Sequence, residues 1–150
     1  MLQDSFGRVH DYLRISLTDN CNFRCAYCMP VEEMEWMPQS KLMSKDEILK
    51  LSETFIGLGV KKIRLTGGEP LVRKEFPEIL ERLSAFPVEL TLTTNGVLIH
   101  KHIEVLKKAG VRSVNVSLDT LNKEKFIKLT RRDQLDQVWE NILLLLQEGF

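Results

Sequence analysis

Residues 62–96 read KIRLTGGEPLVRKEFPEILERLSAFPVELTLTTNG and contain a complete strand, helix and strand in the predicted pattern. The strands are predicted over Lys62–Thr66 and Val88–Thr93, because apolar and polar side chains alternate in both. Between them, apolar residues recur at helical spacing, at Phe76, Ile79, Leu80 and Leu83. This order predicts two parallel strands joined by a right-handed helical crossover.

The same pattern continues on both sides of this unit. Further strands are predicted over Tyr12–Leu17 and Ser113–Leu118, so that the second, third and fourth strands start about 25 residues apart. A run of βαβ units favours an α/β fold with a parallel sheet. About four βα units are present, which is too few to close a barrel, and we therefore expect an incomplete (β/α) parallel barrel.

Further helices are predicted from capping residues and apolar stripes. Ser44 and Glu47 have the spacing of a capping box at a helix start. The apolar stripe of the helix that follows comprises Ile48, Leu51, Phe55 and Leu58, and the helix should end near Gly59. Two later stripes are Ile99, Ile103 and Leu106, before Gly110, and Leu135, Val138, Trp139, Ile142, Leu143 and Leu146, before Gly149.

Each predicted strand has one apolar and one polar face. In Lys62–Thr66, for example, Ile63 and Leu65 lie opposite Lys62, Arg64 and Thr66. The apolar face suits a layer of helices, whereas buried polar groups need water or a polar ligand. We therefore expect a curved sheet around a ligand-filled lumen. The alternative is an antiparallel sheet with one solvated face, and the intervening helices argue against it.

The composition indicates a globular domain. Of 150 residues, 43% are hydrophobic and 28% charged, and 21 basic residues balance 21 acidic ones. There is no apolar run of about 18 residues, so no membrane span is expected, and zero net charge argues against a broad nucleic-acid surface. The first residues lack the features of a secretory signal, and we expect a cytoplasmic, reducing environment in which disulfides are rare.

Three cysteines lie within eight residues, as Cys21, Cys25 and Cys28, directly after the first predicted strand. Loops at the carboxyl ends of barrel strands are where α/β barrels place their chemistry. Three clustered thiolates select zinc, copper(I) or an iron–sulfur cluster. Structural zinc usually has four protein ligands, whereas three cysteines on a four-iron cluster would leave one iron open to an outside ligand. A zinc-binding interaction module remains an alternative.

Two arginines give the sharpest sign of a ligand on the polar face. Arg14 and Arg64 fall on the polar faces of adjacent strands, where two guanidinium groups are costly unless an anion meets them. The guanidinium group of arginine can donate paired hydrogen bonds to a phosphate or a carboxylate. An internal salt bridge to Glu89 or Glu69 is the alternative.

The CxxxCxxC motif, followed one strand later by Gly67-Gly68-Glu69-Pro70, resembles the radical S-adenosylmethionine (SAM) superfamily. The resemblance implies that Cys21, Cys25 and Cys28 hold a [4Fe–4S] cluster whose open iron is chelated by the amino and carboxylate groups of SAM. It implies further cofactor contacts at Tyr27, Gly68 and Ser117.

Within that superfamily, the ordered set of motifs from residue 4 to the end resembles the GTP cyclases that start molybdenum-cofactor biosynthesis. The resemblance implies GTP as substrate, held by Arg14, Arg64 and Thr93, a one-electron reductant, and a 3′,8-cyclised product. Another radical SAM enzyme with an anionic substrate is the alternative. The open edge of the fourth strand leaves room for a homodimer.

Members of that family are about twice as long as this chain. By this resemblance, residues 1–150 are the N-terminal part of the barrel domain, and the remaining barrel and a C-terminal cluster domain are absent. We therefore do not expect residues 1–150 to catalyse the reaction alone. Residues 31–43, with Met34, Trp36 and Met37, are expected to pack as a loop, and a lid is the alternative.

Overall fold

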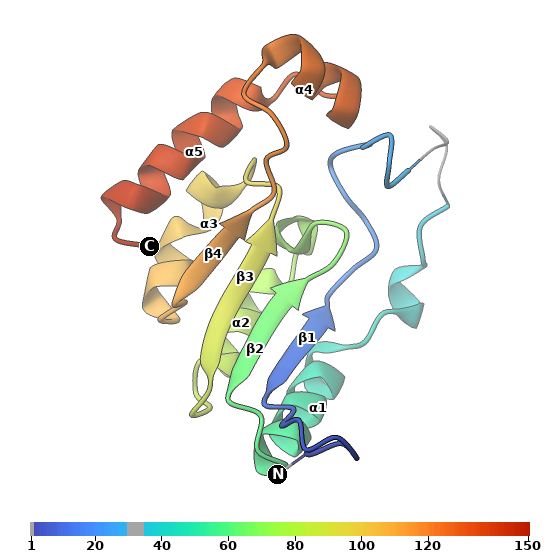
Figure 1. The fold of residues 1–150 in the computed structure, drawn as a ribbon, viewed down its shortest axis with the longest axis vertical. Helices are drawn as coiled ribbons and strands as arrows, with labels where there is room; N and C mark the ends of the chain where they lie inside the picture. The colour runs from blue at the N-terminus through green and yellow to red at the C-terminus, as the bar shows by residue number, and fades with distance from the viewer. Residues whose placement is uncertain (1, 30–34) are drawn as a thin grey trace.

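The computed structural model describes residues 2–29 and 35–150 and has four parallel strands in one sheet. The strands, in sheet order, are β1 (Tyr12–Ser16), β2 (Lys62–Thr66), β3 (Glu89–Thr94) and β4 (Ser113–Val116). Neighbours in the sheet are also consecutive in the chain and run the same way (Figure 1). The predicted α/β fold with about four βα units is confirmed.

Five α-helices accompany the sheet in the described residues. They are α1 (Lys45–Gly57), α2 (Phe76–Leu83), α3 (Ile99–Lys108), α4 (Lys123–Thr130) and α5 (Leu135–Gln147), with two short 3₁₀ turns, η1 (Gln39–Lys41) and η2 (Pro70–Val72). Helices α1 to α3 are the crossovers between consecutive strands, whereas α4 lies beyond the carboxyl ends of the strands (Figure 1). The sequence analysis did not predict α4.

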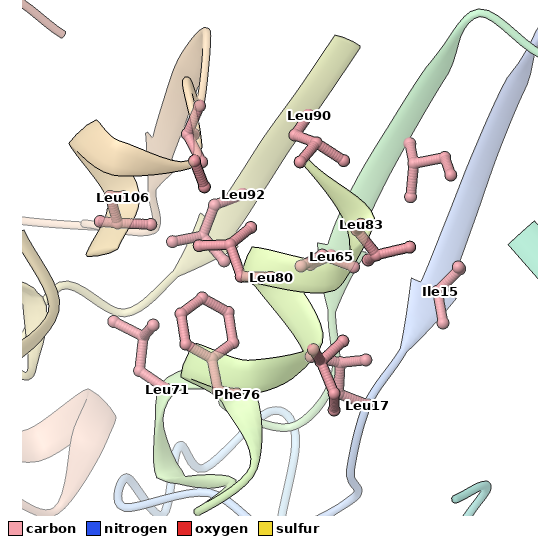
Figure 2. Packing of buried hydrophobic residues seen from close by; sticks show 14 of the residues in the cluster. Ile15, Leu17, Leu65, Leu71, Phe76, Leu80, Leu83, Leu90, Leu92 and Leu106 are labelled. Carbon is pink, nitrogen blue, oxygen red and sulfur yellow. The ribbon is translucent and has the colours of Figure 1, made fainter. Parts of the chain in front are cut away.

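The apolar strand faces and the crossover helices meet in one core. All four predicted core residues of α2 are buried, and Figure 2 shows Phe76, Leu80 and Leu83 packed near Leu65 and Leu92 of the strands. The stripe of α3 is likewise buried, as predicted. The opposite, polar strand face is left uncovered by the described helices (Figure 1). This arrangement confirms the two-faced strands that the alternation indicates.

Helix α1 begins as predicted but turns a different face to the core. The Ser44 side chain accepts from the Glu47 amide at 3.2 Å, and the Glu47 carboxylate accepts from the Ser44 amide at 2.7 Å. The predicted burial of Leu51 and Leu58 is wrong, because both are exposed. The buried residues are Ile48, Leu49 and Ser52. Ser52 can be buried because its hydroxyl donates to the carbonyl of Ile48.

Helix α5 also buries a different face from the predicted one. Leu135 and Val138 are buried as predicted, but Trp139, Leu143 and Leu146 are exposed. The buried stripe continues instead through Asn141 and Leu145. The Asn141 amide donates to the carbonyls of Gly96 and Val97 at 2.7 and 2.9 Å, so burial leaves this polar side chain satisfied.

The strand ends differ from prediction by one or two residues. β1 and β4 end at Ser16 and Val116. Backbone pairing nevertheless continues one step further, since the amides of Leu17 and Ser117 donate to Thr66 and Thr94 at 2.9 Å each. No helix within residues 2–29 and 35–150 has the length and apolar character that a membrane span requires. Residues 31–34 of the predicted packed loop lie outside the described residues.

Candidate functional site

A cavity of about 270 Å³ opens at the carboxyl ends of the strands on the polar side of the sheet. Eight of the nine predicted site residues line it: Arg14, Cys21, Cys25, Tyr27, Cys28, Gly68, Thr93 and Ser117. The ninth, Arg64, lies outside the lining and contacts it through Thr93. The structure therefore brings together residues that are up to 103 positions apart in the chain, from Arg14 to Ser117.

The cysteine loop is held in place by α4. The amides of Arg24 and Ala26 donate to the carbonyls of Thr130 and Leu129 at 3.0 and 2.8 Å. Phe23 is buried against Phe126, with ring centroids 5.7 Å apart in an edge-to-face arrangement. The loop packs against a small apolar cluster, which includes these two rings, Val97, Leu135 and Val138. The unpredicted helix thus positions the cysteines.

The two glycines after β2 allow the chain that leads into Cys21 to pass directly beside them. A Cβ at Gly68 would lie 2.3 Å from the carbonyl oxygen of Asp19, and one at Gly67 would lie 2.6 Å from that of Thr18. The Gly68 amide donates to Thr18 at 2.6 Å. The resemblance in sequence implies a cofactor contact at Gly68; in the structure, the visible close approach of both glycines is to the cysteine-loop backbone.

Glu69 joins the ends of β2 and β3. Its side chain is buried, and its carboxylate accepts from the Leu71 amide at 3.1 Å, the Thr94 hydroxyl at 2.8 Å and the Asn95 amide at 2.7 Å. Burial raises the pKa of Glu69 above its ordinary value. The residue therefore acts on the site through the backbone it holds.

The thiol groups face a shared space. Cys21 Sγ accepts from the Phe23 amide at 3.4 Å and from Asn95 Nδ2 at 3.8 Å, and burial raises the pKa of both the Cys21 and the Cys25 thiols. In the described part of the chain, no three His, Cys, Asp or Glu side chains converge closely enough to hold one metal ion. A cubane cluster binds each thiolate to a different iron, so it needs sulfurs around a common cavity, which these three cysteines line.

Tyr27 links the cysteine loop to the segment after β4. Its hydroxyl donates to Asp119 Oδ2 at 2.7 Å, and this bond raises the pKa of Tyr27. Asp119 lines the same cavity. Ser117, two residues earlier, is exposed there while its backbone amide is paired with Thr94.

The two arginines have different surroundings. Arg64 donates to the Tyr12 hydroxyl at 2.6 Å and to the Thr93 hydroxyl at 3.2 Å. Among the described residues, Arg14 has no ion pair and no side-chain hydrogen bond, although it lines the cavity.

The alternative of an internal salt bridge to these arginines does not hold. Glu89 pairs with Lys62 at 3.0 Å, and the three hydrogen bonds to the Glu69 carboxylate come from two amides and a hydroxyl. Within the described residues, neither glutamate pairs with Arg14 or Arg64.

Three residues of the site escaped the sequence analysis. Asn95 and Asp119 follow predicted strands but were assigned no role, and Phe126 belongs to the helix that was not predicted. Position after a predicted strand was the one available signal for Asn95 and Asp119, because the carboxyl ends of parallel strands meet at one edge.

An incomplete parallel barrel with three cysteines, a glycine pair and an arginine around one cavity defines the class of this protein. Residues 15–150 match the radical SAM superfamily, and the chain belongs to that superfamily.

Curated relatives show which members of the superfamily this chain is similar to. GTP 3′,8-cyclase of Listeria welshimeri is 47% identical over 144 residues, which cover 95% of this chain and 43% of the relative. The mitochondrial GTP 3′,8-cyclase of Arabidopsis thaliana is 49% identical over 152 residues, covering 100% of this chain and 39% of the relative. The chain thus spans less than half the length of these relatives.

A solved structure agrees on the fold. The crystal structure of Streptococcus suis SuiB bound to precursor peptide SuiA superposes with a TM-score of 0.78 over 93% of this chain and 31% of that one. Sequence identity between them is 21%, so the likeness concerns the fold alone.

Proposed function

We propose that this chain is the SAM-binding and GTP-binding part of a GTP 3′,8-cyclase. The reaction converts GTP to (8S)-3′,8-cyclo-7,8-dihydroguanosine 5′-triphosphate, the first step of molybdenum-cofactor biosynthesis. The observation that carries this proposal is the cavity that Cys21, Cys25, Cys28, Gly68 and Arg14 line together. The similarity to two GTP 3′,8-cyclases over nearly the whole chain supports the choice of substrate.

The cysteine loop and the glycine pair form the cofactor side of the proposed site. Cys21, Cys25 and Cys28 would hold a [4Fe–4S] cluster, with SAM beside Tyr27, Gly68 and Ser117. When bound and reduced by one electron, the cluster and SAM supply a 5′-deoxyadenosyl radical. Gly68 lines the cavity, although its amide already donates to the carbonyl of Thr18 and its Cβ side faces the backbone of Asp19 and Asn20. Thiolate ligands need a reducing compartment, which we propose is the cytoplasm.

The arginines form the substrate side. Arg14 lines the cavity and makes no ion pair or side-chain hydrogen bond with any described residue, so its guanidinium group is suited to a phosphate of GTP. Arg64 is already oriented by Tyr12 and Thr93, and it adds a second positive charge directly opposite Arg14. Thr93 also offers a hydroxyl on the cavity wall. Together these groups would anchor the triphosphate and leave the ribose facing the cofactor side.

We further propose that residues 1–150 are the N-terminal part of a longer barrel domain. Within the described residues, β1 pairs only with β2 and β4 only with β3, so both edges of the sheet are open. The relatives are more than twice as long as the part that this chain matches. We therefore expect binding from residues 1–150 and turnover only from a chain of the relatives' length.

Anaerobic reconstitution with iron and sulfide tests the cofactor assignment. We expect four irons per chain in the wild type, a loss of cluster in Cys28→Ser, and binding of SAM by calorimetry only after reconstitution. Purification without oxygen that yields zinc and no iron would overturn the assignment and favour an interaction module.

The substrate is tested separately on the reconstituted protein. We expect GTP to bind to the wild type, and we expect this binding to weaken when Arg14 is replaced. SAM cleavage without any GTP binding would reject the cyclase and leave a radical SAM enzyme for another anionic substrate. A chain extended to the relatives' length should release the cyclised nucleotide in the presence of a strong one-electron reductant.

A further inference from the structure

The side chain of Asn95 is held in one orientation next to a cysteine. Asn95 is 9% exposed, and its Oδ1 accepts from the Val97 amide at 3.2 Å. Its Nδ2 donates to Asn22 Oδ1 at 2.6 Å and points at Cys21 Sγ at 3.8 Å. Because a backbone amide can only donate, the oxygen of Asn95 must face Val97 and its NH₂ group must face the sulfur.

The backbone of Asn95 is fixed independently of its side chain. Its amide donates to the buried carboxylate of Glu69 at 2.7 Å, and that carboxylate also accepts from the Thr94 hydroxyl. The donor to Cys21 therefore rests on β3 and on the end of β2, two rigid elements outside the cysteine loop. A donor fixed in this way has little freedom to reorient when charge changes at the sulfur.

We propose that Asn95 is a positioning residue that orients Cys21 and raises the reduction potential of the cluster through an N–H···S hydrogen bond. Hydrogen bonds to the sulfurs are among the features that set the potentials of iron–sulfur clusters. One-electron reduction adds negative charge to the cluster and its thiolates, and a fixed N–H donor stabilises that charge. This inference rests on the proposed assignment of Cys21 as a cluster ligand.

Three variants separate hydrogen bonding from charge and from folding. Asn95→Asp keeps an oxygen for the Val97 amide but removes the donor and adds a negative charge. Asn95→Ala removes the donor without adding charge. Asn115→Asp makes the same chemical change at an exposed position of β4 that does not line the cavity, and it controls for the added carboxylate.

The measurement is a redox titration of the anaerobically reconstituted protein, followed by electron paramagnetic resonance. We expect four irons per chain in every variant. The equilibrium constant for one-electron reduction should fall about tenfold in Asn95→Asp and Asn95→Ala, which corresponds to about 59 mV. Asn115→Asp should keep the wild-type potential.

Each other outcome has a defined meaning. Asn95 variants with a full cluster and the wild-type potential would overturn the inference alone. A shift in Asn95→Asp and Asn115→Asp without one in Asn95→Ala would also overturn it, because the added charge would then explain the effect. Folded Asn95 variants that take up no iron would show a role in assembly and reject the role in tuning. A wild type that takes up no cluster would overturn the proposed function itself.

Discussion

Arg14 on β1 and Arg64 on β2 stand directly opposite each other in the parallel register of the sheet. Like charges on neighbouring strands destabilise a sheet unless something compensates them. Arg64 is compensated in part by hydroxyl groups of Tyr12 and Thr93, whereas Arg14 has no such partner among the described residues. The register therefore sets two arginine positions side by side, and we expect a bound anion to compensate both charges.

Replacing these arginines should separate ligand binding from stability. Arg14→Ala should weaken GTP binding about tenfold or more, because hydrogen bonds to charged groups contribute about 1.5–3 kcal/mol. It should leave the free energy of unfolding unchanged or slightly higher. Arg64→Ala should weaken GTP binding and also lower the free energy of unfolding by about 1 kcal/mol, the typical net value of a hydrogen bond. Calorimetry with GTP and urea unfolding measure the two effects.

An arginine outside the site provides the control. Arg112 is exposed just before β4 and lines neither the cavity nor the surface around Arg64. Arg112→Ala should change neither GTP binding nor stability appreciably. The anion-site interpretation would be rejected by an Arg14→Ala protein that binds GTP as well as the wild type.

The glycine after β2 should be essential for a different reason. In Gly68→Ala, the new Cβ would meet the carbonyl oxygens of Asp19 and Asn20 at 2.3 and 2.4 Å. These are backbone atoms that cannot turn away, so the cysteine-loop backbone must move. We expect the free energy of unfolding to fall by about 1–3 kcal/mol, the usual cost of overpacking, and the iron content after reconstitution to fall with it.

Gly57 is the matched control for this substitution. It lies at the end of α1 with no atom within 4 Å of an added Cβ. Gly57→Ala should stabilise the protein by up to about 1 kcal/mol, since alanine is the better helix former. Normal stability and normal iron content in Gly68→Ala would contradict the steric argument.

The sheet could be predicted from the sequence because its signal is local. Ile63 and Leu65 alternate with polar neighbours, and a strand with one buried face has only one register that keeps its apolar residues inside. Helix α4 lacks such a signal: its buried residues are Phe126 and Thr130, and the cysteine loop contributes to its packing. In α5, apolar residues outnumber the positions that the core can cover, so periodicity alone could not choose the buried face.

The residues of the candidate site likewise fall into those with a local signal in the sequence and those without one. The cysteines and the glycine pair could be found because each is a contiguous motif with an unusual composition. Asn95 and Asp119 could not be assigned roles, because their partners, Cys21 and Tyr27, are 74 and 92 positions away. Glu69 could be located in a motif, but its role depends on burial against β3, which no local pattern reports.

Phe126 should matter for metal content although it lies on no predicted element. Its ring is 2% exposed and packs edge-to-face on Phe23 in the cysteine loop. Phe126→Ala should lower the free energy of unfolding by about 3–5 kcal/mol, the usual cost of removing a buried phenylalanine, and should reduce iron uptake. The next residue, Ile127, is 38% exposed, and Ile127→Ala should change both quantities little. Equal effects of the two substitutions would argue against α4 as the support of the loop.

Glu69 should make stability depend on pH in a direction opposite to that of most carboxylates. Burial raises the pKa of Glu69 above its ordinary value of 4.5, so the folded chain retains a proton that the unfolded chain has released. The stability contributed by this proton is fully present below about pH 4.5 and is lost as the pH rises through the raised pKa. Urea unfolding of the metal-free, reduced protein at a series of pH values measures this loss.

Glu69→Gln removes the titration but introduces a mismatch. All three partners of the carboxylate donate hydrogen bonds to it, so an amide NH₂ group must face one of those donors. We expect the free energy of unfolding of the variant to be lower by about 1–3 kcal/mol. Because the wild type loses stability as the pH rises, this difference in free energy should shrink as the pH rises.

The stability contributed by Glu47 should depend on pH in the opposite direction, because hydrogen bonds from Ser44 lower the pKa of its carboxyl. The difference in free energy of unfolding between Glu47→Gln and the wild type should therefore shrink as the pH falls. A Glu69→Gln difference that stays constant across the pH series would show that Glu69 is ionised to the same extent in the folded and unfolded chains.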